Sequence, residues 1–173
     1  SGQLSIRWIE KSINKYINTL LSTEGADYVI AIDTDSIYVT FDKLVNSVLP
    51  EGSDVTKIVS FLDTICKDKI ESYIDTSYKL LHTYVNGYEQ KMFMEREVIA
   101  DKGIWTAKKR YILNVYNNEG VAYKEPKLKI MGIESVRSST PEWCRENLHS
   151  LIETIINTDE KTVQVALEDY RSK

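Results

Sequence analysis

A short polar stretch between two β-forming runs is the feature that most constrains this chain. Residues 28–32 and 37–41 are rich in Tyr, Val and Ile, and they flank the tetrad Asp33-Thr34-Asp35-Ser36. Two such runs around so short a polar break are typical of a β-hairpin, because aspartate and serine favour turns. We therefore predict a hairpin whose turn lies at 33–36.

The rest of the sequence alternates between helical and strand patterns. Apolar residues at helical spacing predict a helix over 9–21 and a long helix from Ser53 or Asp54 to near Asn86. Two further helices are expected after Thr140 and from Thr158 or Asp159. Alternating or β-rich runs predict strands at 92–100, 106–116, 121–124 and 128–131. The sum predicts an α+β fold, with one antiparallel sheet and helices packed on one of its faces.

The composition excludes several classes of protein. The 173 residues are 42% hydrophobic and include three prolines, which argues against a disordered tail or a fibrous protein. A net charge of -4 excludes a polycation that binds nucleic acid through overall charge. No apolar run reaches the roughly 18 residues of a membrane span, so we expect a soluble intracellular protein. Cys66 and Cys144 are far apart and are expected to be reduced thiols in the packing.

The tetrad could also carry chemistry. A tight turn holds carboxylates in fixed positions, where divalent cations can bridge phosphates during phosphoryl transfer. Asp33 and Asp35 are therefore candidate metal ligands. Two other readings stay open. One is an ordinary acidic turn, and the other is a glycosyltransferase that uses an Asp-x-Asp turn to hold a metal on a nucleotide-sugar diphosphate.

A basic stretch follows in the second half of the chain. Residues 102–129 contain seven basic and two acidic side chains, a net charge of +5, so the remaining residues carry -9. Lys108, Lys109, Arg110 and Tyr111 are at its centre, at the expected entry to a strand. Basic residues with aromatic residues between them can bind a phosphate backbone, although a solvated basic hairpin would look the same.

A third candidate is a pair of carboxylates, Glu95 and Glu97. Alternation along the strand expected at 92–100 places both on one face, where they could add negative charge to a metal site. A role in salt bridges explains the pair at least as well.

Together these residues resemble the family B DNA polymerases, in particular the replicative polymerases of T-even-like bacteriophages. The tetrad followed by residues 37–39 is similar to the family's Tyr-Gly-Asp-Thr-Asp-Ser hairpin, and residues 108–111 match its Lys-Lys-Arg-Tyr motif. Residues 92–97, 125–134 and 138–141 also look like sequence from the palm domain of the phage enzymes. The resemblance covers nearly the whole chain, with its motifs in the family's order.

The resemblance implies a role for each candidate residue. Asp35 would be the principal metal-binding and catalytic carboxylate and Asp33 its weaker neighbour, with Glu97 as an accessory carboxylate. The motif at 108–111 would bind DNA, with Lys109 and Tyr111 in the minor groove and Lys108 and Arg110 supporting on the phosphates. The implied cofactor is Mg²⁺, two ions in the complete enzyme, with Mn²⁺ as an alternative. The implied partners are primer-template DNA, deoxynucleoside triphosphates and the rest of the polymerase.

The sequence departs from the family pattern in two ways. Ala31 and Ile32 replace the usual Tyr-Gly, which removes the small residue that lets a primer end approach closely. The family's first and second polymerase motifs are absent from the 173 residues, and the sequence starts within a helical pattern. We therefore expect a fragment that is inactive alone, with the C-terminal part of the palm at 1–139 and the start of a helical thumb at 140–173.

Three further expectations concern the setting of this fragment. A naturally split polymerase, in which this chain is a DNA-binding subunit, is the alternative to an excised fragment. Palm faces left open could pair two copies as a homodimer. A phage enzyme would work in the cytoplasm of the bacterial host, without contact to a membrane.

Overall fold

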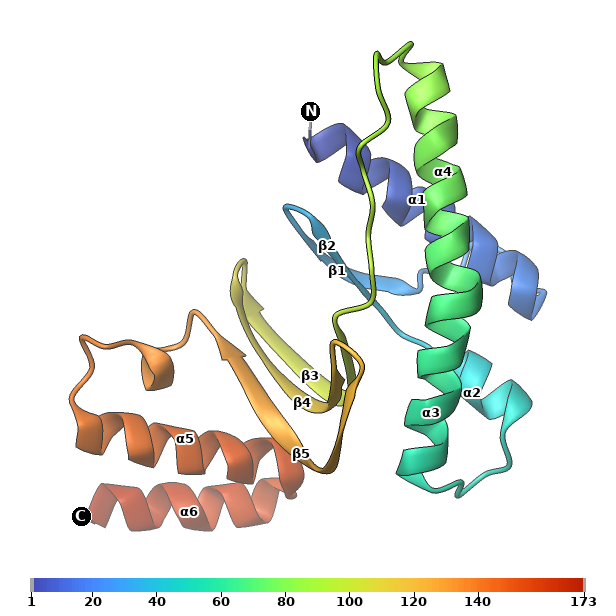
Figure 1. Ribbon diagram of the computed structural model, residues 1–173. Helices are drawn as coiled ribbons and strands as arrows, with labels where there is room; N and C mark the ends of the chain where they lie inside the picture. Colours follow the sequence, from blue (N-terminus) through green and yellow to red (C-terminus); the bar gives the residue numbers. More distant parts are fainter. Residues whose placement is uncertain (1, 173) are drawn as a thin grey trace. The chain divides into compact units, whose positions relative to one another are not determined.

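The computed structural model describes residues 2–172, which form two compact units that divide between Glu97 and Val98 (Figure 1). The elements of the first unit are α1 (Gly2–Leu21), β1 (Val29–Asp33), β2 (Ser36–Val39), α2 (Asp42–Val48), α3 (Val55–Ile65), the π-helical turn η1 (Cys66–Ile70) and α4 (Glu71–Tyr84). Those of the second unit are β3 (Val98–Ala107), β4 (Arg110–Asn118), β5 (Val121–Met131), the 3-10 turn η2 (Glu134–Val136), α5 (Glu142–Asn157) and α6 (Glu160–Ser172). The α+β class with antiparallel strands is confirmed.

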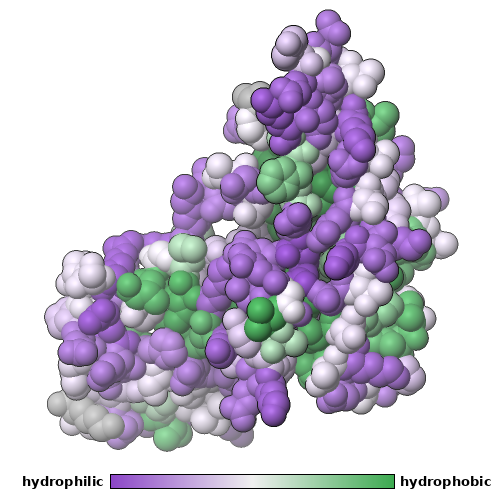
Figure 2. All heavy atoms as spheres, in the orientation of Figure 1, coloured by the Kyte–Doolittle hydropathy of each residue, from purple (hydrophilic) through white to green (hydrophobic). Residues whose placement is uncertain are grey.

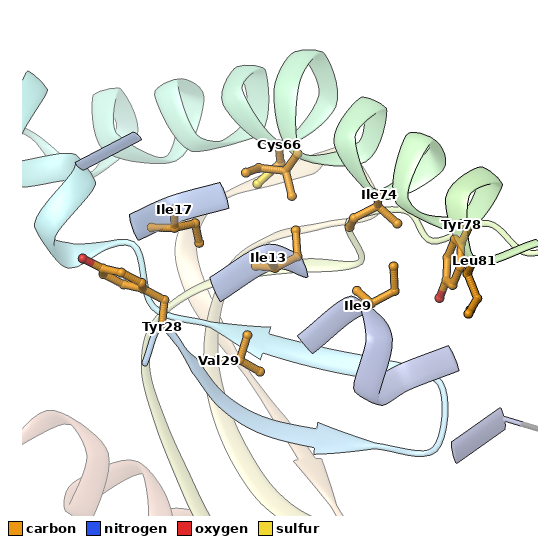
Figure 3. Packing of buried hydrophobic residues seen from close by; sticks show 10 residues of the cluster. Ile9, Ile13, Ile17, Tyr28, Val29, Cys66, Ile74, Tyr78 and Leu81 are labelled. Carbon is orange, nitrogen blue, oxygen red and sulfur yellow. The ribbon is translucent and has the colours of Figure 1, made fainter. Parts of the chain in front are cut away.

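The core of the first unit forms along one face of α1. Ile9, Ile13 and Ile17 recur every four residues, which places them in one row on the helix, and all three are fully buried. Figure 3 shows this row with Val29 of β1 and Ile74 of α4 in the same cluster. Burial of each such side chain contributes about 1.5–3 kcal/mol. The hairpin is therefore fixed to the helices by its inward-facing residues.

The long helix predicted from residue 53 or 54 is present, with one irregularity. Asp54 occupies the N-cap position of α3, and η1 and α4 continue the same helix (Figure 1). At its end Asn86 has a φ of 49°, and the N–H of Gly87 donates to the carbonyl of His82 at 3.0 Å. The wide turn at Cys66–Ile70 adds a local irregularity of a kind that often occurs at functional sites.

The second unit is a three-stranded sheet in the order β3-β4-β5 with α5 on one face. Ile112 of β4 packs with Ile152 and Ile156, which are four residues apart on α5. Glu119 and Gly120 both have positive φ and form the turn between β4 and β5. Asp159 precedes α6, and its carboxylate accepts from the backbone N–H of Thr162 at 2.9 Å. The helices expected after 140 and from 158 or 159 are therefore confirmed.

Several strand predictions are wrong in detail. Residues 92–97 do not form a strand, and β3 begins only at Val98, so the strands make two sheets and not one. The N–H of Arg96 donates to the side chain of Glu71, at 2.9 Å, instead of to a neighbouring strand. The run 106–116 is divided by a turn at Lys108 and Lys109. The strands expected at 121–124 and 128–131 are one element, β5, and the short helix α2 was not predicted.

The described part of the chain has no helix that is long and apolar enough to cross a membrane. Figure 2 shows a face that is mostly hydrophilic, with hydrophobic residues in separate patches. Cys66 is buried and Cys144 is half-buried, and both are free thiols as predicted.

Candidate functional site

The acidic tetrad forms the tip of the hairpin in the first unit. Asp33 ends β1 and pairs with Ser36, which begins β2, so Thr34 and Asp35 make the turn. Thr34 has a φ of 46°, and the N–H of Asp35 donates to the carbonyl of Asp33 at 2.5 Å. A bond between residues two apart makes the turn very tight. The hairpin predicted from the sequence is confirmed, with its turn at the predicted place.

The base of this hairpin is fixed by a side chain of α1. The Oδ1 of Asn14 accepts from the backbone N–H groups of Tyr28 and Val29, at 2.7 Å and 3.2 Å. The Nδ2 of Asn14 donates to Asp27 at 2.8 Å. Because Tyr28 and Val29 are buried, these donors would otherwise lack water as a partner. Nothing in the local sequence marks Asn14 as an anchor of this kind.

The two aspartates of the turn differ in exposure. Asp33 is half-buried and its Oδ1 accepts from the hydroxyl of Thr34 at 3.1 Å, whereas Asp35 is exposed. Tyr78 of α4 lies close enough to sense this charge. Burial raises the pKa of Tyr78, and the charge of Asp35 raises it further. The turn thus presents negative charge at an accessible place.

The carboxylates of Asp33 and Asp35 can provide only some of the ligands of a magnesium ion. Within residues 2–172, no group of three or more His, Cys, Asp or Glu side chains is placed to hold a metal ion. Mg²⁺ is usually bound through one or two carboxylates, with waters and substrate phosphates filling the other positions. Asp33 and Asp35 can supply that protein share.

The residues that replace the family's Tyr-Gly lie on β1. Ile32 is half-buried and packs against the core cluster of α1 and α4. Ala31 pairs with Tyr38 of β2. The bulk of the isoleucine is thus part of the hairpin's attachment to the helices.

The third candidate, Glu97, is in the irregular segment before β3. Glu95 and Glu97 are exposed, and their expected shared strand face is wrong because 92–97 is not a strand. The segment is held by its neighbours instead: Arg96 forms an ion pair with Asp63, and its N–H donates to Glu71. Asp63 and Glu71 flank the π-helical turn. Sequence reasoning missed this attachment, since the partners are 33 and 25 residues away.

The basic motif forms a tight turn in the second unit. Ala107 pairs with Arg110, which leaves Lys108 and Lys109 as the turn between β3 and β4. Both lysines are exposed, while Tyr111 is buried at 8% exposure. A basic turn with two solvent-exposed side chains can approach phosphates closely.

Arg110, the third basic residue of the motif, is engaged within the protein. Its Nη2 lies 3.1 Å from the Oε1 of Glu134, and Arg137 lies 3.6 Å from the same oxygen. The pKa of Glu134 is lowered, first by its own backbone N–H and then by the charge of Arg110. The acidic turn belongs to the first unit and the basic turn to the second.

Comparison with known proteins gives two strong matches, although no protein-family model matches the chain. The chain is 42% identical over 168 residues to a DNA-directed DNA polymerase of Escherichia phage RB69, which covers 92% of this chain. It is 39% identical over 181 residues to a DNA-directed DNA polymerase of Enterobacteria phage T4, covering 99% of this chain. The chain spans about a fifth of the length of these curated relatives. It is therefore a homologue of one segment of the phage DNA-directed DNA polymerases, as the motifs in its sequence predict.

Proposed function

We propose that this chain is part of a family B DNA polymerase. In this role it supplies carboxylates that bind the catalytic metals, and basic residues that bind the primer-template duplex. The observation that carries the proposal is the identity of about two residues in five with phage DNA polymerases over at least 92% of the chain. The tight acidic turn and the exposed basic turn supply the chemistry that such a role needs. The same matches favour a polymerase over an Asp-x-Asp glycosyltransferase.

The proposed chemistry at the acidic turn is phosphoryl transfer. Mg²⁺, when bound, neutralises charge on the phosphates and lowers the pKa of an attacking hydroxyl. Asp35 and Asp33 would hold this ion from a turn whose backbone is fixed by the hairpin and by Asn14. Glu97 is proposed as a nearby accessory carboxylate, positioned by the attachment of Arg96 to the long helix.

The proposed role of the basic turn is to bind the phosphate backbone and the minor groove of the duplex. Lys108 and Lys109 are exposed, so Lys108 can approach the phosphates and Lys109 the minor groove. Tyr111 is buried, so its proposed contact with the minor groove requires that its side chain become exposed when DNA binds. We place the palm at 1–139 and the start of the thumb at 140–173, a boundary that falls within the second unit.

Binding of a fluorescent primer-template duplex by the 173-residue chain tests the DNA role. We expect binding that weakens with salt, and a lower affinity for Lys109→Ala. Lys161→Ala, which removes an exposed lysine of α6, is the matched control and should bind like the parent chain. Equal losses for both variants, or binding only to a nucleotide sugar, would refute the proposal.

A primer-extension assay tests the expected inactivity. The first and second polymerase motifs are absent from these 173 residues, so the chain holds only part of the catalytic set. With Mg²⁺ and all four nucleotides we expect no extension. Extension that Asp35→Ala abolishes would show that this chain suffices for catalysis.

A further inference from the structure

The turn at Lys108 and Lys109 adopts a backbone conformation that a lysine rarely takes. Lys109 has a φ of 61°, in the left-handed region that favours glycine. Such a residue persists only where its surroundings hold it, and strained residues of this kind occur often at binding sites. The neighbours of the turn therefore decide whether the two lysines keep their positions.

Gly132 is one of these neighbours. It follows Met131, the last paired residue of β5, and its φ is 68°. A Cβ at this position would overlap the carbonyl oxygen of Lys109, and it would lie 3.2 Å from the Cγ of Arg110. The backbone after β5 thus packs directly against the backbone of the turn, which only a residue without a side chain allows.

A small ionic network continues this contact. Glu134 accepts from Arg110 at 3.1 Å, and the Nη2 of Arg137 donates to the carbonyl of Gly132 at 3.4 Å. Arg137 also lies 3.6 Å from the Oε1 of Glu134. The side chains are about half exposed, so each pair alone is weak. Together with the packing of Gly132 they join 132–137 to Lys109 and to Arg110, the residue that follows the turn.

We propose that residues 132–137 form a brace that holds the Lys108–Lys109 turn in its DNA-binding conformation, with Gly132 and Glu134 as positioning residues. The inference rests on the DNA role proposed above, and it adds which residues hold the DNA-binding turn in place. Gly132 fixes the backbone of Lys109 by close packing, and Glu134 fixes Arg110, the next residue. The lysines then meet the duplex already ordered, and binding does not have to impose the strained backbone.

The test uses the 173-residue chain and the same fluorescent duplex. Gly132→Ala should bind about tenfold more weakly, equivalent to about 1.4 kcal/mol, which is the size of the cost of a left-handed residue. Its salt slope should also fall by about one, because one phosphate contact is lost. Gly120→Ala is the matched control: Gly120 has a φ of 86°, but an added Cβ there meets nothing within 4 Å. We expect its affinity to equal that of the parent chain.

Glu134→Gln separates bracing from simple electrostatics by the sign of its effect. Removal of a negative charge beside the turn should tighten DNA binding if Glu134 acts only through its charge. If Glu134 positions Arg110, binding should instead weaken by about threefold, the size of an exposed ion pair. This surface variant also carries the test if Gly132→Ala fails to fold, which circular dichroism would reveal.

The outcomes distinguish the brace from the DNA role itself. Weaker binding by Gly132→Ala and Glu134→Gln, with Gly120→Ala unchanged, supports the brace. If Lys109→Ala weakens binding while Gly132→Ala binds like the parent chain, or Glu134→Gln binds more tightly, the brace is refuted and the DNA role stands. If the parent chain does not bind the duplex, or Lys109→Ala has no effect, the DNA role fails and the brace with it.

Discussion

The side chain of Asn14 provides a sharp test of how the acidic hairpin is held. Its Oδ1 accepts from the N–H groups of Tyr28 and Val29, at 2.7 Å and 3.2 Å. In Asn14→Ala the buried N–H of Tyr28 loses this partner, whereas Val29 keeps the carboxylate of Asp27 at 3.2 Å. An unsatisfied buried donor costs about 1–3 kcal/mol. We therefore expect the free energy of opening of the hairpin to fall by about 2 kcal/mol.

Amide hydrogen exchange measures this quantity locally. A loss of about 2 kcal/mol should speed the exchange of the hairpin amides about thirtyfold, if they exchange by this opening. Asn147→Ala, which removes an asparagine whose amide donates to the carbonyl of Trp143 in the same helix, should leave the hairpin unchanged. Unchanged hairpin exchange in Asn14→Ala would refute the anchoring role.

Two further predictions concern titratable groups. Burial raises the pKa of the Cys66 thiol to about 11. At pH 8 iodoacetamide should therefore modify Cys144 first and Cys66 only when the chain unfolds. Equal rates of modification for the two thiols would contradict this prediction. Hydrogen bonds from Thr162 lower the pKa of Asp159 in the folded chain. The ionised carboxylate therefore stabilises α6 fully above the ordinary pKa of aspartate, and this stabilisation is lost as the pH falls through the lowered pKa of the folded state. Amide exchange in α6 should show this pH dependence, and Asp159→Asn, which keeps an acceptor, should abolish it.

The features that sequence reasoning predicted well are those set by local chemistry. The acidic hairpin follows from two β-forming runs and a polar turn, and the helices follow from apolar spacing with Asp54 and Asp159 at their starts. These signals lie within a few residues of the structure that they specify. The motifs that identified the polymerase resemblance lie in the same local segments.

The features that were missed depend on distant residues. Alternation at 92–97 suggested a strand, but the segment is irregular and is held by Glu71 and Asp63 instead. Lysine is not a turn former, so Lys108 and Lys109 gave no turn signal. Their turn packs against Gly132, which comes after β4 and β5 in the sequence. Contacts of this kind are set by the fold and cannot be read from neighbouring residues.

The most direct test of the central claim is to locate a bound metal ion. We would titrate Mn²⁺ into the isotope-labelled chain with primer-template DNA present and record which amide signals broaden. Broadening centred on Asp33–Ser36, lost in Asp35→Asn and kept in Asp42→Asn as the control from α2, is the result that we predict. Broadening centred elsewhere, or equal in both variants, would contradict the claim that this turn holds the catalytic metal.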